Sequence, residues 1–391
     1  MIFPLTSHKP ILLAGNGARA AGASEIIYEF SDKTCIPVLT TMNAVDLVQD
    51  KDRIGFIGTY GNRAANMILN ECDLVIAVGA RLGLRQVGKD TKNFAPKAKL
   101  IRADIDAFEL SRDVKEDEIK YQIDAKEFMK ELLKEEIPSY HEWQKTCFEV
   151  RNLLSQQDRE IGNLVIEEIS DLLPKDPIVA VDVGQNECWS AQSLTLKGRK
   201  GRILIGGGYG SMGCGLPFAI GASISNGNST VFCITGDGGL QMNIQELETV
   251  KRENIPIKIL VLNNRVLGKI SEIQYVSYDS RYAQTTEKSG YSVPDFQKVA
   301  EAYGIRAINL SSYKELKEYN SWLEDDKPCL INIMLPEESL LIPKINWSSG
   351  SIEPKLEEDY MKKIREIFKA FDEELYCKNV KISAGGGTAI S

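Results

Sequence analysis

The fold is decided by residues 230–264, which read TVFCITGDGGLQMNIQELETVKRENIPIKILVLNN. Two apolar runs rich in β-branched residues, 230–235 and 257–262, enclose a segment of helical length. Strands that are apolar throughout and joined by a helix predict parallel neighbours in a sheet that is covered on both faces. Asp237 and Asn264 then follow the carboxyl ends of two such strands, where open α/β sheets bind ligands.

The segment between these strands predicts an anion-binding helix. Asn243, followed three residues later by Glu246, predicts a capping box at the start of this helix. The free N–H groups of its first turn then point toward whatever lies beside Asp237. One carboxylate and one amide oxygen suit a Mg²⁺ ion that keeps phosphate oxygens as further ligands. The glycines on either side of Asp237 allow a diphosphate to approach the backbone closely.

The same alternation of strands and helices extends along most of the chain. We therefore expect an α/β protein with two doubly wound parallel-sheet domains and a C-terminal helical tail. The expected domains are residues 1–158, 159–345 and 346–391. Further strands are predicted at 9–14, 36–40, 73–78, 99–104, 177–184 and 328–334, and helices at 164–173 and 216–223. Residues 134–160 read as a charged helical connection, 356–375 as one amphipathic helix, and 383–391 as a flexible end.

Composition excludes several classes of protein. The 391 residues include 47 Lys and Arg against 55 Asp and Glu, with no basic cluster, so a nucleic-acid partner is not expected. No apolar run approaches the roughly 18 residues of a membrane span, and the start MIFPLTSHKP lacks the pattern of a secretory leader. The 8 cysteines have no metal-ligand spacing, which favours reduced thiols in a cytoplasmic protein.

Histidine is nearly absent from the chain. His8 lies in the leading segment and His141 in a charged helical stretch, and neither has a constellation around it. Mechanisms that need a catalytic or metal-ligating histidine are therefore disfavoured. If the protein is an enzyme, another group moves the protons.

The motif Gly236-Asp237-Gly238, followed after residues 239–262 by Asn263-Asn264, resembles the signature of thiamine-diphosphate-dependent enzymes. The resemblance implies thiamine diphosphate and Mg²⁺ as cofactors. It also implies that the metal is bound by Asp237, Asn264 and the main-chain carbonyl of Val266. The alternative is a simple strand–turn–helix connection, since Asp-Gly turns are common.

Two further segments resemble the acetolactate synthase group of that family. Residues 206–217, GGGYGSMGCGLP, are similar to the loop beneath the cofactor, where a side chain matching Met212 supports its bent shape and the carbonyl matching Gly210 accepts from its 4′-amino group. Met212 as core filler is the alternative. Residues 183–186 resemble the turn that contacts the diphosphate, with Asn186 in place of a histidine. The implied cofactor-binding set is Val183, Gln185, Asn186, Gly210, Ser211, Met212, Asp237, Gly238, Gly239, Asn264, Val266, Leu267 and Gly268.

The first unit resembles the central domain of the same family. Residues 15–19, GNGAR, and 79–81, GAR, follow strands that line a nucleotide cleft in some members, where FAD or an adenine nucleotide binds. The full dinucleotide fingerprint is missing, and no acidic residue ends the next strand. Glycines that serve helix–strand packing are the alternative explanation.

The family's N-terminal domain, whose glutamate activates the cofactor, has no counterpart here, so no catalytic residue can be assigned. We expect a 2-keto acid as substrate, with a homo-oligomer, a separate pyrimidine-binding subunit, or both, as partners; a truncated or diverged member with little activity is the alternative. Lys269 and Ile273 replace the methionine and tryptophan of acetolactate synthases, so the product is open, and Lys269 either faces an anionic substrate or is solvated. The other interpretations are a noncatalytic pseudoenzyme or structural subunit and an NAD-type Rossmann protein.

Overall fold

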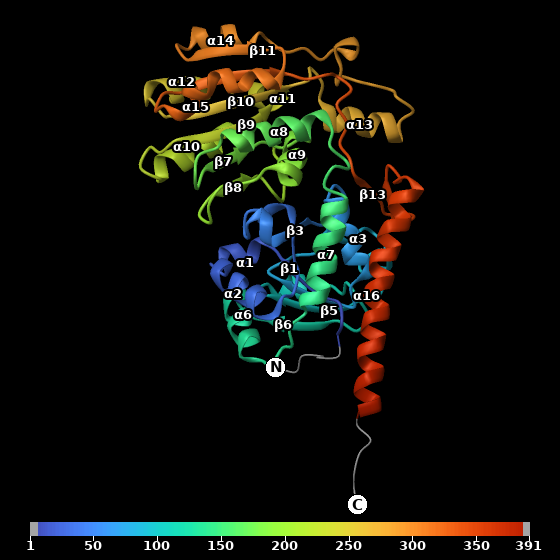
Figure 1. Cartoon of the computed structure of the whole chain (residues 1–391). Helices are drawn as coiled ribbons and strands as arrows, with labels where there is room; N and C mark the ends of the chain where they lie inside the picture. The colour runs from blue at the N-terminus through green and yellow to red at the C-terminus, as the bar shows by residue number, and fades with distance from the viewer. Residues whose placement is uncertain (1–6, 386–391) are drawn as a thin grey trace, which may run out of the picture. The chain divides into compact units, whose positions relative to one another are not determined.

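A computed structural model describes the backbone of residues 7–385 and the side chains of residues 7–377. The chain divides into two compact units. The first comprises residues 1–158 and 343–391, and the second comprises residues 159–342. Each unit contains a parallel six-stranded sheet flanked by helices, as expected from the sequence (Figure 1).

The sheet of the first unit has the strand order β3-β2-β1-β4-β5-β6, and all of its strands are parallel. Its strands are β1 (Pro10–Ala14), β2 (Val38–Thr40), β3 (Arg53–Phe56), β4 (Leu74–Val78), β5 (Lys99–Asp104) and β6 (Ile119–Gln122). The four predicted strands are confirmed, whereas β3 and β6 were not predicted. The two missed strands lie at the sheet edges and contain charged residues, so they lack a continuous apolar run.

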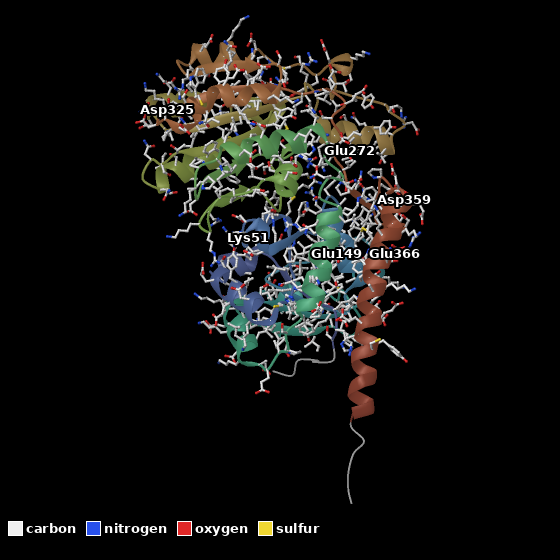
Figure 2. The ribbon with its side chains drawn as sticks, in the orientation of Figure 1. Lys51, Glu149, Glu272, Asp325, Asp359 and Glu366 are labelled. Carbon is white, nitrogen blue, oxygen red and sulfur yellow. The ribbon has the colours of Figure 1, made fainter. Side chains whose placement is uncertain are left out.

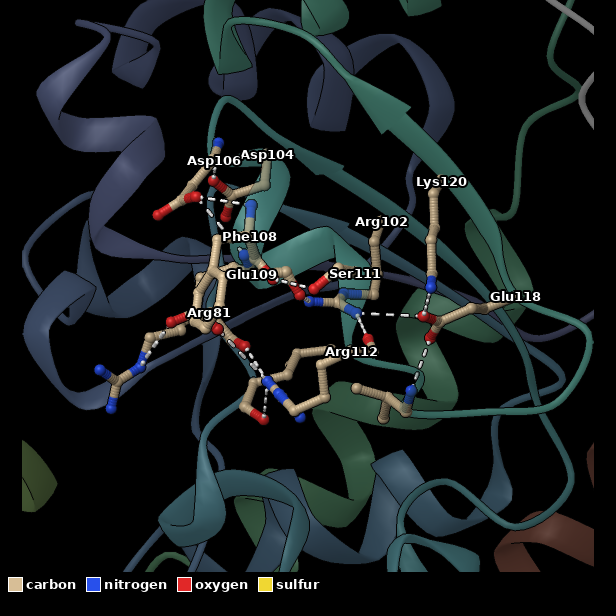
Figure 3. Close-up of polar contacts among 12 residues, drawn as sticks. Arg81, Arg102, Asp104, Asp106, Phe108, Glu109, Ser111, Arg112, Glu118 and Lys120 are labelled. Carbon is tan, nitrogen blue, oxygen red and sulfur yellow. Dashed lines mark hydrogen bonds and ion pairs between the residues drawn. The ribbon is translucent and has the colours of Figure 1, made fainter.

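The helices of the first unit complete its two layers and connect its strands. They are α1 (Asn16–Ala20), α2 (Ser24–Thr34), α3 (Arg63–Glu71), α4 (Leu84–Val87), α5 (Ala107–Ser111), α6 (Ala125–Lys134), α7 (His141–Leu153) and α16 (Glu358–Gly385). A short antiparallel pair, β13 (Lys344–Asn346) and β14 (Ser351–Glu353), precedes α16. Near β6, the buried Arg102 is paired with the buried Glu118 and donates to the carbonyls of Glu109 and Arg112 (Figure 3).

The prediction that residues 134–160 only connect the domains is wrong. Helix α7 buries Trp143 and Val150 in the core of the first unit, and the Trp143 indole N–H donates to the carbonyl of Pro10 at 3.0 Å. Helix α16 packs against α7 through Ile364 and Phe368, while the exposed Glu149 of α7 and Glu366 of α16 lie on the outer faces of these helices (Figure 2). Charged residues on these outer faces hid the buried side of α7.

Helix α16 begins two residues later than predicted and extends past the predicted end at residue 375. Residues 383–385 of the expected flexible end continue this helix, and the rest of that end lies outside the described residues.

The sheet of the second unit has the order β11-β12-β10-β9-β7-β8 and is also parallel throughout. Its strands are β7 (Ile178–Val181), β8 (Arg202–Ile205), β9 (Val231–Gly236), β10 (Ile257–Asn263), β11 (Arg306–Leu310) and β12 (Cys329–Met334). Its helices are α8 (Ile161–Leu172), α9 (Gln185–Ser193), α10 (Gly215–Ser225), α11 (Asp237–Met242), α12 (Glu246–Arg252), α13 (Gly268–Ser277), α14 (Phe296–Ala302) and α15 (Asn320–Glu324). The outer strands β8 and β11 were not predicted.

Two further observations concern the cysteines and the apolar character of the helices. All eight cysteines lie in the described part of the chain, none forms a disulfide there, and five of them are buried. No helix among the described residues is long and apolar enough to cross a membrane.

Candidate functional site

The candidate site lies at the carboxyl edge of the second sheet, where the strand order reverses. From β7 the chain passes to β8 on one side, and from β9 it continues to β10 on the other. In doubly wound sheets, ligands bind in the crevice outside the strands at this point. Asp182 follows β7 directly and Asp237 follows β9, so two carboxylates mark the reversal.

The predicted capping box at Asn243 and Glu246 is wrong. Helix α11 begins at Asp237 itself, directly after β9, and Asn243 ends this helix. The Asn243 side chain donates to the carbonyl of Gly213 at 2.7 Å, and the Glu246 carboxylate accepts from the Thr249 hydroxyl at 2.8 Å. The predicted helix is therefore two short helices, and the helix start lies at Asp237 rather than six residues later.

Asp237 is a buried carboxylate, 2% exposed, that forms no ion pair within the described chain. Its Oδ1 accepts from the Gly238 N–H at 2.6 Å and from the Tyr291 hydroxyl at 2.7 Å, and its Oδ2 accepts from the Arg265 N–H at 2.7 Å. Burial raises the pKa of Asp237 although these hydrogen bonds oppose the shift. A buried carboxylate without a counter-charge is costly, which favours a cation at this position.

Asn264 lies at the same edge, because β10 is the parallel neighbour of β9. Its amide nitrogen donates to Gln185 Oε1 at 3.0 Å, and its Oδ1 accepts from the Val266 N–H at 3.3 Å. Between the two candidate ligands stands the Arg265 N–H, which donates to Asp237 and also to Asn263 Oδ1 at 3.1 Å. Arg265 has a φ of +56°, a left-handed conformation that makes this tight turn possible.

The donor set of this turn fits a hard cation with phosphate ligands. Asn264 Oδ1 and the Val266 carbonyl each accept one hydrogen bond and keep a second lone pair. Together with Asp237 they offer one charged and two neutral oxygens, which suits Mg²⁺. No group of three His, Cys, Asp or Glu residues that could hold a metal occurs among the described residues, so a multi-carboxylate or thiolate centre is not an alternative there.

Two glycines allow the close packing around this turn. A Cβ on Gly238 would lie 2.5 Å from Leu267 Cδ2 and 3.1 Å from the Tyr291 hydroxyl oxygen. A Cβ on Gly268 would lie 1.9 Å from Gln185 Oε1. The space beside Asp237 is thus lined by Leu267 and Tyr291, both of which reach it with the ends of side chains.

Asp182 is a residue of the site that the sequence analysis missed. It is 1% exposed, and its carboxylate accepts from the N–H groups of Val183 at 2.7 Å and Gly213 at 2.9 Å and from the Thr235 hydroxyl at 3.1 Å. Burial raises its pKa against these hydrogen bonds. Asp182 therefore ties the glycine-rich loop to β7 and β9. The sequence signal that could have identified Asp182 is Asp182-Val183-Gly184 at the end of β7, which occupies the same place as Gly236-Asp237-Gly238 at the end of β9.

The glycine-rich loop before α10 presents Met212 at the surface. Gly208, Gly210 and Gly213 all have positive φ values, 100°, 63° and 91°, which favour glycine. Met212 is 40% exposed, and its Sδ lies 3.9 Å from the Cβ position of Gly238, so it is not core filler. Ser211, beside it, is exposed as well.

The turn after β7 begins helix α9, every residue of which from Gln185 to Ala191 is buried. The Asn186 amide donates to the carbonyl of Asp182 at 2.6 Å, and the Gln185 amide donates to the carbonyl of Ser339 at 2.8 Å. Lys269 is half-buried, with its Nζ 3.7 Å from the thiol of Cys188, so its side chain is only partly in contact with solvent. The side chain turns toward α9 because Gly268 brings the start of α13 close to that helix.

The equivalent edge of the first sheet is packed differently. A Cβ on Gly15, after β1, would lie 2.1 Å from the carbonyl oxygen of Gly79, after β4, and one on Gly17 would lie 2.8 Å from the Gly79 Cα. The Gly17 N–H donates to the Gly79 carbonyl at 2.9 Å. These glycines therefore serve a direct contact between two backbone segments.

Comparisons with known proteins agree with the motifs. Residues 182–333 match the C-terminal TPP binding domain of thiamine pyrophosphate enzymes, and residues 5–132 match their central domain. Acetolactate synthase isozyme 2 large subunit of Escherichia coli is 34% identical over 85% of this chain and 60% of its own length. A probable acetolactate synthase large subunit of Methanocaldococcus jannaschii is 35% identical over 92% of this chain and 65% of its own length.

The chain thus spans less than two thirds of the length of these relatives. Both matched segments and both relatives indicate the same family. The chain belongs to the thiamine pyrophosphate enzymes and contains their central and C-terminal domains.

Proposed function

We propose that the second unit binds thiamine diphosphate through Mg²⁺ and forms the diphosphate-binding part of an acetolactate synthase-like decarboxylase or carboligase that acts on a 2-keto acid. The observation that carries the proposal is Asp237, a buried carboxylate that forms no ion pair with the described residues, placed where the sheet order reverses and inside the matched C-terminal domain. The relatives' names support the reaction class.

Each part of the site has a role in this proposal. Asp237, Asn264 and the carbonyl of Val266 hold the metal, and Gln185, Asn186 and the turn at Leu267 and Gly268 border the diphosphate. Val183, Gly238 and Gly239 complete this border. The carbonyl of Gly210 would accept a hydrogen bond from the 4′-amino group of the cofactor, and Ser211 and Met212 would support its ring portion. When bound, thiamine diphosphate supplies the nucleophilic carbon and the electron sink that decarboxylation of a 2-keto acid needs, which is consistent with a chain that has only two histidines.

The surface around this edge supports a site that another protein segment completes. Helix α13 has no buried residue, and it exposes Ile270, Ile273 and Val276. The glycine-rich loop exposes Tyr209 and Met212 beside it. A cluster of exposed apolar side chains marks a protein–protein contact. We propose that the pyrimidine-binding half comes from outside these two domains, in an oligomer or from a separate subunit.

Calorimetric titration tests the proposal. The native chain is expected to bind thiamine diphosphate, and more weakly inorganic diphosphate, only with Mg²⁺ present. Asp237→Asn is expected to weaken this binding at least about a hundredfold, because it removes the one charged metal ligand. Asp326→Asn, an exposed carboxylate of the same unit, is the matched control and should bind as the native chain does.

Two outcomes would contradict the proposal. If the native chain does not bind thiamine diphosphate in the presence of Mg²⁺, the result would favour the noncatalytic interpretation. Turnover of 2-keto acids by the pure chain would contradict the proposal that another protein segment completes the site. A panel of 2-keto acids with the completed enzyme identifies the product, and acetolactate as the dominant product would show that Lys269 and Ile273 do not change it.

A further inference from the structure

Tyr291 contacts the proposed metal ligand, although no sequence motif pointed to it. Its hydroxyl donates to Asp237 Oδ1 at 2.7 Å, and its oxygen lies 3.1 Å from the Cβ position of Gly238. It is the only side-chain donor to Asp237 in the described chain, since the other donors are main-chain N–H groups. This contact lies inside the space that the proposed function assigns to the metal and the diphosphate.

The hydrogen bonds to Asp237 show what a cation must displace to bind Oδ1. A carboxylate oxygen offers two in-plane acceptor positions. Both positions of Oδ1 are filled, by the Gly238 N–H at 2.6 Å and by the Tyr291 hydroxyl, whereas Oδ2 accepts from the Arg265 N–H and keeps one position. The Gly238 N–H is fixed by the first turn of α11, so it cannot leave without unwinding the helix. The Tyr291 hydroxyl can leave by a movement of its side chain.

The segment that carries Tyr291 is suited to such a movement. Residues 281–284 are exposed, and Thr285 is the one buried residue between 277 and 291, with its hydroxyl on Gln274 Oε1 at 2.6 Å. The short helix η4 (Glu287–Ser289) follows, closed by reciprocal bonds between Thr286 and Ser289. Tyr291 ends this turn, and its N–H donates a hydrogen bond to the Thr286 carbonyl at 3.0 Å. Between residues 286 and 292 the segment is attached at the Tyr291 side chain and by a long hydrogen bond of 3.4 Å from the Gln241 amide to the Ser292 carbonyl. Before residue 286 it is attached through Gln274, which bonds Ala283 and Thr285.

From this geometry we propose that Tyr291 is a displaceable latch on Asp237: its hydroxyl fills the second acceptor position of Oδ1 beside Gly238, and binding of the metal with a diphosphate releases it together with residues 286–292. The inference rests on the proposed function, because it needs a cation at Asp237. In the empty site the hydroxyl proton partly compensates the buried charge. Metal binding therefore competes with this hydrogen bond. Tyr291 is a positioning residue, since it acts through Asp237.

The variant Tyr291→Phe tests the latch, because it keeps the ring and removes only the donor. Mn²⁺ affinity, measured by electron paramagnetic resonance with inorganic diphosphate present, is expected to rise about tenfold. Tyr282→Phe, in the same segment but exposed, is the matched control and should leave the affinity unchanged. Unchanged or weaker Mn²⁺ binding by Tyr291→Phe would overturn the latch.

A spectroscopic measurement gives an independent readout. Saturation of the native chain with Mg²⁺ and inorganic diphosphate is expected to change the near-ultraviolet absorbance of tyrosine, and this change should be missing in Tyr291→Phe and present in Tyr282→Phe. An identical difference spectrum for the native chain and Tyr291→Phe would overturn the release of Tyr291. Failure of the native chain to bind Mn²⁺ at all would instead overturn the proposed function, so the two failures are distinguishable.

Discussion

The amino and carboxyl edges of the second sheet differ in whether their buried charges form ion pairs. At the amino edge, Lys258 is 0% exposed and donates to Asp325 at 2.9 Å, and Arg306 donates to the same carboxylate (Figure 2 labels Asp325). At the carboxyl edge, Asp182 and Asp237 are buried and accept hydrogen bonds, but neither forms an ion pair with a residue that the structure describes. The Arg306 hydrogen bond lowers the pKa of Asp325, whereas burial raises the pKa of the other two.

This contrast shows which edge is complete within the chain. Buried charges are normally paired or bound to a metal. The amino edge provides its own counter-charges, so it needs nothing from outside. At the carboxyl edge, Asp182 and Asp237 form no ion pair within the described residues, which supports the proposed metal site. The first unit shows a third arrangement, in which Gly15 and Gly79 close the edge by direct backbone contact.

The largest effect is expected when the carboxylate that pairs with Lys258 and Arg306 at the amino edge is removed. Asp325→Ala leaves Lys258 buried without a counter-charge, and removing one partner of a buried pair costs several kcal/mol. We expect the free energy of unfolding of the second unit to fall by about 4 kcal/mol. Urea denaturation followed by tryptophan fluorescence measures this free energy. Trp322 reports on the amino edge, because the guanidinium carbon of Arg306 lies 4.9 Å from the centroid of its ring.

The neighbouring Asp326 provides the control for this prediction. It is exposed, so Asp326→Ala should change the stability by less than about 0.5 kcal/mol. Equal effects of the two substitutions would mean that the charge network at the amino edge does not stabilise the fold. Mg²⁺-dependent binding at the opposite edge should survive in whatever fraction of Asp325→Ala is folded.

The second-largest effect is expected at the packed edge of the first unit. In Gly15→Ala the new methyl group would meet the Gly79 carbonyl, which is main chain and cannot turn aside. We expect a loss of about 2–3 kcal/mol in the stability of the first unit. Thermal unfolding of the two variants measures this loss. Gly221→Ala in α10 has no atom within 4 Å of its new methyl group, so it should be neutral or stabilising. A neutral Gly15→Ala would contradict the packing explanation.

The sequence predicted the parts of this molecule that depend on local pattern. Apolar runs identified the central strands, and the spacing between Asp237 and Asn264 brought both to one edge. Contacts between distant segments were not predictable. Tyr291 reaches Asp237 across 54 positions, and Asp182 meets Gly213 across 31. The capping box failed because the motif for a helix start also occurs where one short helix ends and another begins.

A smaller effect is expected when the same kind of substitution is made at the open edge. The methyl group of Gly238→Ala would meet Leu267 and the Tyr291 hydroxyl, which are ends of side chains and can move. We expect less than about 1 kcal/mol of lost stability but about tenfold weaker Mg²⁺-dependent binding of diphosphate, which is about 1.4 kcal/mol. Calorimetry and denaturation on the same sample separate the two. A stability loss as large as that of Gly15→Ala would mean that the two edges do not differ.

The smallest expected effect concerns the pH dependence of the carboxyl edge. Because burial raises the pKa of Asp182, the folded chain holds this proton at pH values where the unfolded chain has already lost it. Stability contributed by this group therefore falls as the pH rises through the interval between the two pKa values. Asp182→Asn does not titrate, so its stability relative to the native chain should improve from about pH 4 to about pH 7 in urea denaturation. Several donors oppose burial, which keeps the effect small.

The sign of this change distinguishes the two edges of the sheet. Asp325 has a lowered pKa, so its contribution is present above the ordinary aspartate pKa and is lost as the pH falls toward its folded value. The relative stability of Asp325→Ala should therefore improve on acidification, opposite to Asp182→Asn. If both variants shifted in the same direction, the hydrogen bonds to Asp182 would outweigh its burial. The carboxyl edge would then hold its charge without strain, and the strongest argument for a cation there would be lost.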